Sequence, residues 1–205
     1  MHPVVIIQDG ARRDENALRW AAAHAQSIGT GFEIHRPHDD FRAQLVVVGH
    51  RGTGQLTTQC DTVVVRGTTA AIDARHRHVT ALVSGGPGDG RVLRHAADFA
   101  RRRGARLLVL HAAVPGIDHV LDRAAAVLGG FAHRAMVVPE HPLEVIARCT
   151  DTDLVVVGSG QTRGTVARAA MDHAPCPVLV VRQPVLEALR GELAVPTPRQ
   201  CEGVR

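Results

Sequence analysis

The sequence predicts an α/β protein with two Rossmann-like parallel-sheet units in tandem, the first of them reduced. Short apolar runs rich in Val, Leu and Ile alternate with helical segments, and this succession occurs twice along the 205 residues. Strands that are apolar on both faces and are joined by helical crossovers are typical of parallel sheets covered on both sides. A chain of this length fits one large domain or two small ones, and the repeat favours two.

The stretch from Asp153 to Arg182 displays the pattern most clearly. It holds an apolar run at 154–157, a glycine-marked loop at 158–164, a helical segment at about 165–173 and a second apolar run at 178–181. We expect strand, loop, helix and strand, which is one crossover of a parallel sheet.

The first half begins with a predicted strand at 2–7 and a turn at 8–10. From Asp14 the apolar residues follow helical spacing, and the predicted helix stops at Gly29. Further strands are predicted at 32–35, 45–48 and 63–66.

The second half repeats this order. A strand at 78–83 ends in Ser84-Gly85-Gly86, and a helix is predicted from Asp89 to Gly104. Strands at 107–110 and 135–138, a helix at about 118–128 and a helix that opens at His141 with Pro142 in its first turn complete the unit.

The spacing between matching residues supports an internal repeat. Asp9 matches Ser84 and Asp14 matches Asp89, both 75 residues apart. The offset is 109 at Leu45–Gly49 and Leu154–Gly158, and 116 at the closing strands, so the first half lacks elements that the second half has. We therefore expect a reduced unit at 1–67, a linker at 68–76, a complete unit at 77–183 and a C-terminal tail at 184–205.

Composition excludes several classes of function. The chain has no lysine, and all 24 basic residues are arginine. A Walker lysine, a Schiff-base lysine and a lysine general base are therefore excluded. The formal net charge is +4, but the arginines are scattered and aromatic residues make up only 2%, which argues against nucleic-acid binding.

Cysteine and histidine usage favours a cytoplasmic protein without a metal site. Cys60, Cys149, Cys176 and Cys201 lie far apart without a C-x-x-C pair, which argues against zinc and disulfides and fits a reducing compartment. The 13 histidines form no second pair at ligand spacing. The sequence contains neither a secretory leader nor a membrane-spanning run, so no membrane partner is expected.

The motifs of both halves resemble the universal stress protein family. The resemblance is carried by HAPCPVLVVR at 173–182, by LVVVGHRGTG at 45–54, by the first strand ending in Asp9 and by a Leu-Arg-x-Ala-Ala helix in both halves. It covers 1–67 and 77–183. Relatives in this family commonly pair through their last strand, so the closing strands are expected to meet edge to edge within the chain, as an intramolecular pseudo-dimer, or between copies, as a homo-oligomer.

The resemblance also implies where a nucleotide would bind. Members that bind ATP have an acidic residue after the first strand, which contacts the adenine, and a G-x2-G-x9-G-[ST] loop around the phosphates. Glycine N–H groups and a helix N-terminus are suited to phosphate. In the first half Asp9, Gly49 and Gly52 fit the opening of this pattern, but its closing pair is absent.

The second half fits the other end of the pattern. Gly164 and Thr165 match the closing pair, whereas Ser84 stands at the acidic position and only five residues separate Gly158 from Gly164. Neither half holds the complete set. The candidate binding residues are Asp9, Gly49, Gly52, Ser84, Gly158, Ser159, Gly164 and Thr165.

Alternative readings of these residues stay open. The glycines also fit simple turns at strand ends, Asp9 fits a turn, and Asp14 and Asp89 are expected to cap their helices. The resemblance implies a regulatory or interaction protein of the stress response whose nucleotide binding is weak or lost. The alternative is a protein that holds ATP or a related adenine nucleotide in loop 158–165.

An enzyme of hydrolase or phosphotransfer type is less favoured by the sequence. Its turnover would depend on Asp9 or Ser159. The G-S-G sequence around Ser159 does not fit the G-x-S-x-G pattern, and no base, nucleophile and orienting group stand together.

Overall fold

The computed structural model describes residues 2–8, 14–37, 39, 41–50, 60–112, 119–159 and 165–182. In chain order the elements are β1 (Val4–Ile7), α1 (Glu15–Ser27), β2 (Phe32–His35), β3 (Leu45–Gly49), β4 (Thr62–Val65), α2 (Thr69–Ile72), β5 (His78–Val83), α3 (Asp89–Arg103), β6 (Arg106–Ala112), α4 (His119–Leu128), β7 (His133–Val138), α5 (Pro142–Ala147), β8 (Leu154–Gly158), α6 (Thr165–His173) and β9 (Val178–Val181). They follow the predicted order and confirm the α/β fold class.

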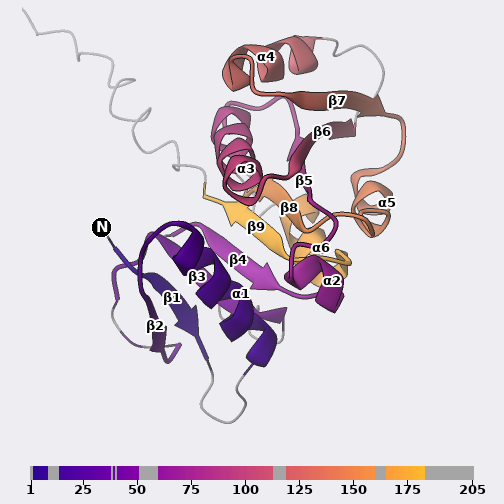
Figure 1. The fold of residues 1–205 in the computed structure, drawn as a ribbon. Coiled ribbons are helices and arrows are strands. Elements are labelled where there is room, and N and C mark those ends of the chain that lie inside the picture. Colours follow the sequence, from indigo (N-terminus) through magenta and orange to yellow (C-terminus); the bar gives the residue numbers. More distant parts are fainter. Residues whose placement is uncertain are drawn as a thin grey trace, which may run out of the picture.

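The strands form one nine-stranded sheet in the order β2-β1-β3-β4-β9-β8-β5-β6-β7 (Figure 1). Neighbouring strands are parallel except at the seam, where β4 and β9 are antiparallel and Val63 lies opposite Leu179. The predicted pairing of the closing strands within the chain is thereby confirmed. Residues 1–67 do not form a separate sheet but add four strands to the sheet of the second half.

The sheet has the same strand order on both sides of this seam. From the seam outward, the first half runs β4, β3, β1, β2 and the second half runs β9, β8, β5, β6, β7. The first crossover of each half matches as well, since α1 connects β1 to β2 and α3 connects β5 to β6. Among the described residues of the first half no strand corresponds to β7, in agreement with the change in sequence offset.

The segment between the two halves contains a short helix. The sequence predicts a linker at 68–76, and within it the structure places α2. The Thr68 side chain accepts a hydrogen bond from the Ala71 N–H at 3.2 Å, and Ala71 and Ile72 are buried. A side-chain cap and two buried residues are sufficient to hold this single helical turn against the sheet.

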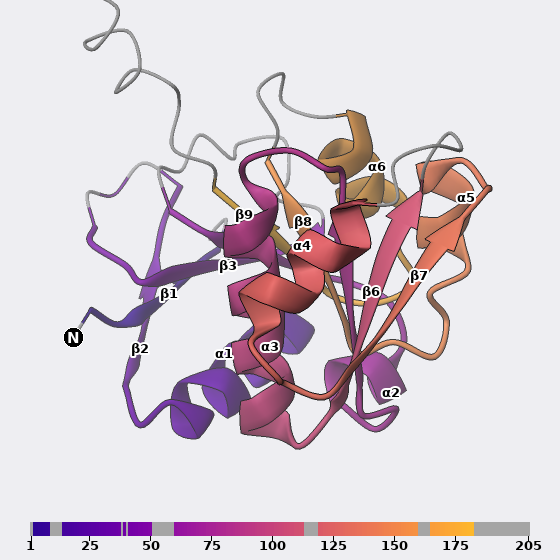
Figure 2. The ribbon, with the colours of Figure 1, turned by 90° about the horizontal axis from the view of Figure 1, so that it is seen from above.

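Helices cover the sheet on both faces (Figure 2). Val79 and Ala81 of β5 belong to the core cluster that includes α3, whereas Val155 and Val157 of β8 belong to the cluster that includes α6. Alternate strand residues therefore face opposite layers.

The larger core runs through both halves, because α1 and α3 pack against the same face. The Trp20 ring is fully buried and stacks on His24 and Phe99, with ring centroids 5.2 and 6.1 Å away. The Arg103 guanidinium lies 5.1 Å from the centre of the Trp20 ring. This stack joins the first half to the second.

A buried carboxylate makes a second connection across the seam. Asp61, just before β4, is 6% exposed. Its carboxylate accepts hydrogen bonds from Arg91 Nη2 at 3.1 Å and from the backbone N–H of Arg182 at 2.7 Å, and it lies 3.1 Å from His95 Nε2. The first half thus contacts both α3 and the end of β9 through one side chain.

The aromatic stack predicts a specific loss of stability in mild acid. Burial, followed by the charges of Arg103 and Arg102, lowers the pKa of His24 from 6.5 to about 4. Between these values the unfolded chain binds the proton more strongly than the folded chain, so the free energy of unfolding falls as the pH falls. We expect a loss of about 2 kcal/mol between pH 7 and pH 5 from this group.

Denaturant unfolding at a series of pH values measures this effect. In His24→Phe the ring stack is kept and the titrating group is removed, so the loss between pH 7 and pH 5 is expected to shrink by about 2 kcal/mol. Equal pH slopes for the two proteins would show that His24 does not carry the effect.

Candidate functional site

The candidate site lies at the carboxyl ends of β5 and β8. Here the chain crosses from β5 to β6 on one side and returns to β8 on the other side. In sheets of this kind a crevice forms outside the strand ends where the crossovers diverge. The ladder between β5 and β8 reaches only Ala81 and Val156, whereas the ladder between β5 and β6 continues to Val83 and His111.

Ser84 follows β5 directly and is held by a carboxylate. The N–H groups of Ser84 and Gly85 donate to Asp89 Oδ2 at 3.1 and 2.7 Å, and Ser84 Oγ lies 3.3 Å from Asp89 Oδ1. Gly85 has a φ of +86°, a conformation that glycine adopts without strain and that lets successive N–H groups converge. An internal carboxylate therefore occupies this anion cradle.

This arrangement corrects the prediction that Asp89 caps α3. The capping position belongs to Gly88, which offers no side-chain acceptor, and Asp89 is the first residue of the helix. The Asp89 side chain turns back to the loop because two converging N–H groups satisfy a carboxylate better than one orphan helical N–H group. The sequence alone gave no sign of this contact.

Gly158 and Ser159 lie at the same edge of the sheet as Ser84. Gly158 ends β8 opposite Val181, and the Ser159 N–H donates to the Val181 carbonyl at 2.9 Å. The backbone N–H of Ser159 is therefore used by the sheet. Thr165 begins α6, and Gly164 lies outside the described residues.

In the first half, the described part of the site centres on Gly49, the last residue of β3. Asp14 caps α1 as predicted, because its Oδ1 accepts from the Ala17 N–H at 3.1 Å. The same carboxylate packs so closely on Gly49 that a Cβ added there would overlap it. Asp9 and Gly52 lie outside the described residues.

Each half places a carboxylate near the carboxyl ends of its strands, although the two contact strands that do not correspond, Asp14 the end of β3 and Asp89 the loop after β5. Asp14 and Asp89, at positions that correspond in the repeat, each lie at the carboxyl end of a central strand or its loop. His111 lies beside this edge, 2% exposed, with Nδ1 2.9 Å from the Val83 carbonyl. The backbone contact orients the imidazole, which argues for a structural role of this ring.

Two further properties bear on ligands. Within the ranges that the structure describes, no group of three or more His, Cys, Asp or Glu side chains is placed to hold a metal ion. Among the same residues, no helix has the length and apolar character needed to cross a membrane.

Comparison with solved structures first shows which known proteins share this fold. A universal stress protein from Archaeoglobus fulgidus DSM 4304 superposes with a TM-score of 0.58 over 82% of this chain and 76% of that chain, at 14% identity. A universal stress protein from Archaeoglobus fulgidus in complex with dAMP matches 51% of this chain and 95% of that chain, with a TM-score of 0.42 and 24% identity. The first of these comparisons shows the shared fold.

Sequence comparison points to the same family. A universal stress protein of Mycobacterium tuberculosis is 28% identical over 184 residues, which cover 69% of this chain and 62% of that protein. The chain therefore spans less than two thirds of the length of the relative that it matches. No protein-family model matches the sequence. Together, sequence and fold confirm the resemblance to the universal stress proteins that the motifs indicated.

Proposed function

We propose that this chain is a regulatory or interaction protein of the stress response, of the universal stress protein type, with weak or lost nucleotide binding. In this proposal residues 1–67 and 77–183 are unequal copies of one unit, and the antiparallel seam between β4 and β9 is their internal pseudo-dimer contact. We place the protein in the cytoplasm, and the buried thiols of Cys149 and Cys176, which form no disulfide in the described part of the chain, support this assignment.

The observation that carries the proposal is the carboxylate of Asp89 in the loop after β5. A nucleotide that used the Ser84 and Gly85 N–H groups would have to displace this carboxylate, which already accepts from both. A phosphate that bound nearby would be repelled by the same charge, by about 1–4 kcal/mol at 4 Å depending on the solvent. The Asp14 carboxylate likewise places a negative charge against Gly49, where it would repel a phosphate.

A second candidate is an adenine-nucleotide protein that uses loop 158–165 of the second half. The observation that favours it is the start of α6 at Thr165, shortly after β8 ends at Gly158. A helix N-terminus of this kind provides unpaired N–H groups and a positive dipole end. The two candidates differ in the affinity that they predict for ATP.

Calorimetric titration with Mg·ATP separates the candidates. We expect the wild-type chain to show no saturable binding below about 1 mM, which corresponds to a binding free energy weaker than about −4 kcal/mol. Asp89→Asn keeps an acceptor but removes the charge, so it is expected to strengthen binding of ATP at least about tenfold. Asp98→Asn removes an exposed charge elsewhere on α3 and serves as the matched control.

One result would decide for the second candidate. Saturable micromolar binding by the wild-type chain that disappears in Gly164→Asp would overturn the proposal, because that substitution places a carboxylate in loop 158–165. An affinity that is unchanged in Asp89→Asn would show that the carboxylate does not limit binding.

A further inference from the structure

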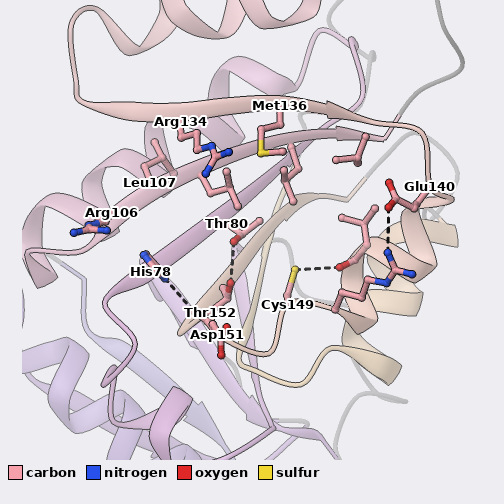
Figure 3. A pocket seen from close by; sticks show the side chains of 15 residues that line it. His78, Thr80, Arg106, Leu107, Arg134, Met136, Glu140, Cys149, Asp151 and Thr152 are labelled. Atoms are coloured by element: carbon pink, nitrogen blue, oxygen red, sulfur yellow. Dashed lines mark hydrogen bonds and ion pairs between the residues drawn. The ribbon is translucent and has the colours of Figure 1, made fainter.

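A pocket of about 490 Å³ opens on the sheet face opposite α3 and α4, between β5, β6 and β7 and the segment from α5 to β8 (Figure 3). Its volume lies within the range of about 300–1,000 Å³ that is common for small-molecule sites. The pocket is distinct from the loops after β5 and β8 that form the candidate nucleotide site, since neither Ser84 nor Gly158 lines it.

The pocket exists because α5 is too short to cover the sheet. This helix has six residues and is about 9 Å long, whereas β6 has seven residues and is about 23 Å long. On the opposite face α3 has 15 residues and lies along the strands. The outer strands β6 and β7 are therefore covered on one face and partly open on the other.

The floor of the pocket is apolar. Alternate residues of β6 and β7 face this side, namely Leu108, Leu110, Met136 and Val138, and Val145 of α5 adds to the wall. Leu108 pairs in register with Arg134, and Leu110 pairs with Met136, so these side chains share one face. Apolar area that is open to water favours binding of a ligand that covers it.

Positive charge gathers at one end of this floor. Arg106 and Arg134 both line the pocket and are exposed, and neither guanidinium group forms an ion pair or hydrogen bond with the described part of the chain. Figure 3 shows both on the side of the pocket where His78 lies, with Glu140 on the other side. Arg148 and Glu140 form an ion pair at 3.1 Å and offset each other. With Asp151 included, the lining carries a net charge of about +1 from these groups.

We propose that this pocket binds a linear amphipathic monoanion, a fatty carboxylate of medium chain length. The carboxylate lies between Arg106 and Arg134, whose planar guanidinium groups suit carboxylate geometry. The alkyl chain follows β7 over Met136 to Val138, a path of about 13 Å from Arg134. The inference is independent of the proposed function, because no residue of the nucleotide site takes part.

Binding of decanoate to the full chain tests the proposal by calorimetry. We expect saturable binding at one site, at least tenfold weaker in Arg106→Gln/Arg134→Gln and tenfold weaker for decanol than for decanoate. The control Arg101→Gln/Arg168→Gln removes the same charge from exposed positions on α3 and α6, 63% and 80% exposed, and should leave the affinity unchanged.

A second variant tests the floor. Met136→Glu places a carboxylate under the alkyl chain and is expected to abolish decanoate binding, while Trp20 fluorescence and circular dichroism check that the fold is kept. Absence of saturable decanoate binding to the wild-type chain would overturn the proposal. Equal affinity of the wild-type chain and Arg106→Gln/Arg134→Gln, or of decanoate and decanol, would overturn it as well. Each of these results leaves the ATP titration unaffected.

Discussion

Replacing Trp20 by alanine is expected to lower the free energy of unfolding by about 3–5 kcal/mol, the range for removing a large aromatic side chain from a packed core. Trp20 is the only tryptophan, is fully buried and stacks between α1 and α3. Its loss removes the contact with Phe99 and leaves the Arg103 guanidinium with only the more distant Phe99 ring, 6.0 Å away. Urea unfolding followed by circular dichroism measures the change.

Trp20→Phe is the matched control for this prediction. The Trp20 Nε1 group is buried and has no hydrogen-bond partner in the described part of the chain, so phenylalanine loses no polar contact there. We expect Trp20→Phe to cost less than about 1.5 kcal/mol. A cost below that value for Trp20→Ala would mean that the stack does not hold the two halves together.

Asp61→Ala is expected to lower the free energy of unfolding by about 2–4 kcal/mol. Burial raises the pKa of Asp61, but the hydrogen bond from His95, the Arg182 N–H and the charges of His95 and Arg91 outweigh it, so the pKa is lowered overall. The substitution leaves these donors without their acceptor at the seam. The lower end of the range applies if water reaches Arg91, which is 42% exposed.

Thermal and urea unfolding of Asp61→Ala and Asp98→Ala test this contrast. Asp98 also pairs with an arginine on α3, at 2.8 Å, but both side chains are more than half exposed, so its loss is expected to cost no more than about 0.5 kcal/mol. Equal costs for the two variants would contradict a special role of Asp61. Because the pKa of Asp61 is lowered, its contribution to the free energy of unfolding is present above the ordinary carboxyl pKa and is lost as the pH falls below that value. This loss occurs at lower pH than the loss expected from His24.

Local patterns predicted the elements well. The observed bounds of β2, β5, α6 and β9 agree with those predicted from the sequence. A short apolar run bounded by turn residues indicates a buried strand from the local sequence alone, and helical spacing with a capping residue indicates a helix in the same way. The resemblance to the universal stress proteins, whose relatives commonly pair through their last strand, then implied the pairing of β4 with β9 that the structure shows.

Contacts that depend on distant residues or on backbone conformation could not be predicted. Asp61 contacts Arg91 and Arg182, which are 30 and 121 residues away. The bonds from Ser84 and Gly85 to Asp89 require the positive φ of Gly85, which the sequence permits but does not specify. The pocket depends on where α5 ends. The sequence marks the start of this helix, at His141 and Pro142, more clearly than its end.

The seam between β4 and β9 also restricts how this molecule can associate. Both strands are hydrogen-bonded on either side, so within the described sheet only β2 and β7 have an unpaired edge. Phe32 and Ile34 on β2 are 42% and 56% exposed, and Val137 on β7 is 44% exposed. Strand addition by another polypeptide must therefore start at one of these two outer strands, which differ in sequence, so a partner strand that fits β2 is not expected to fit β7.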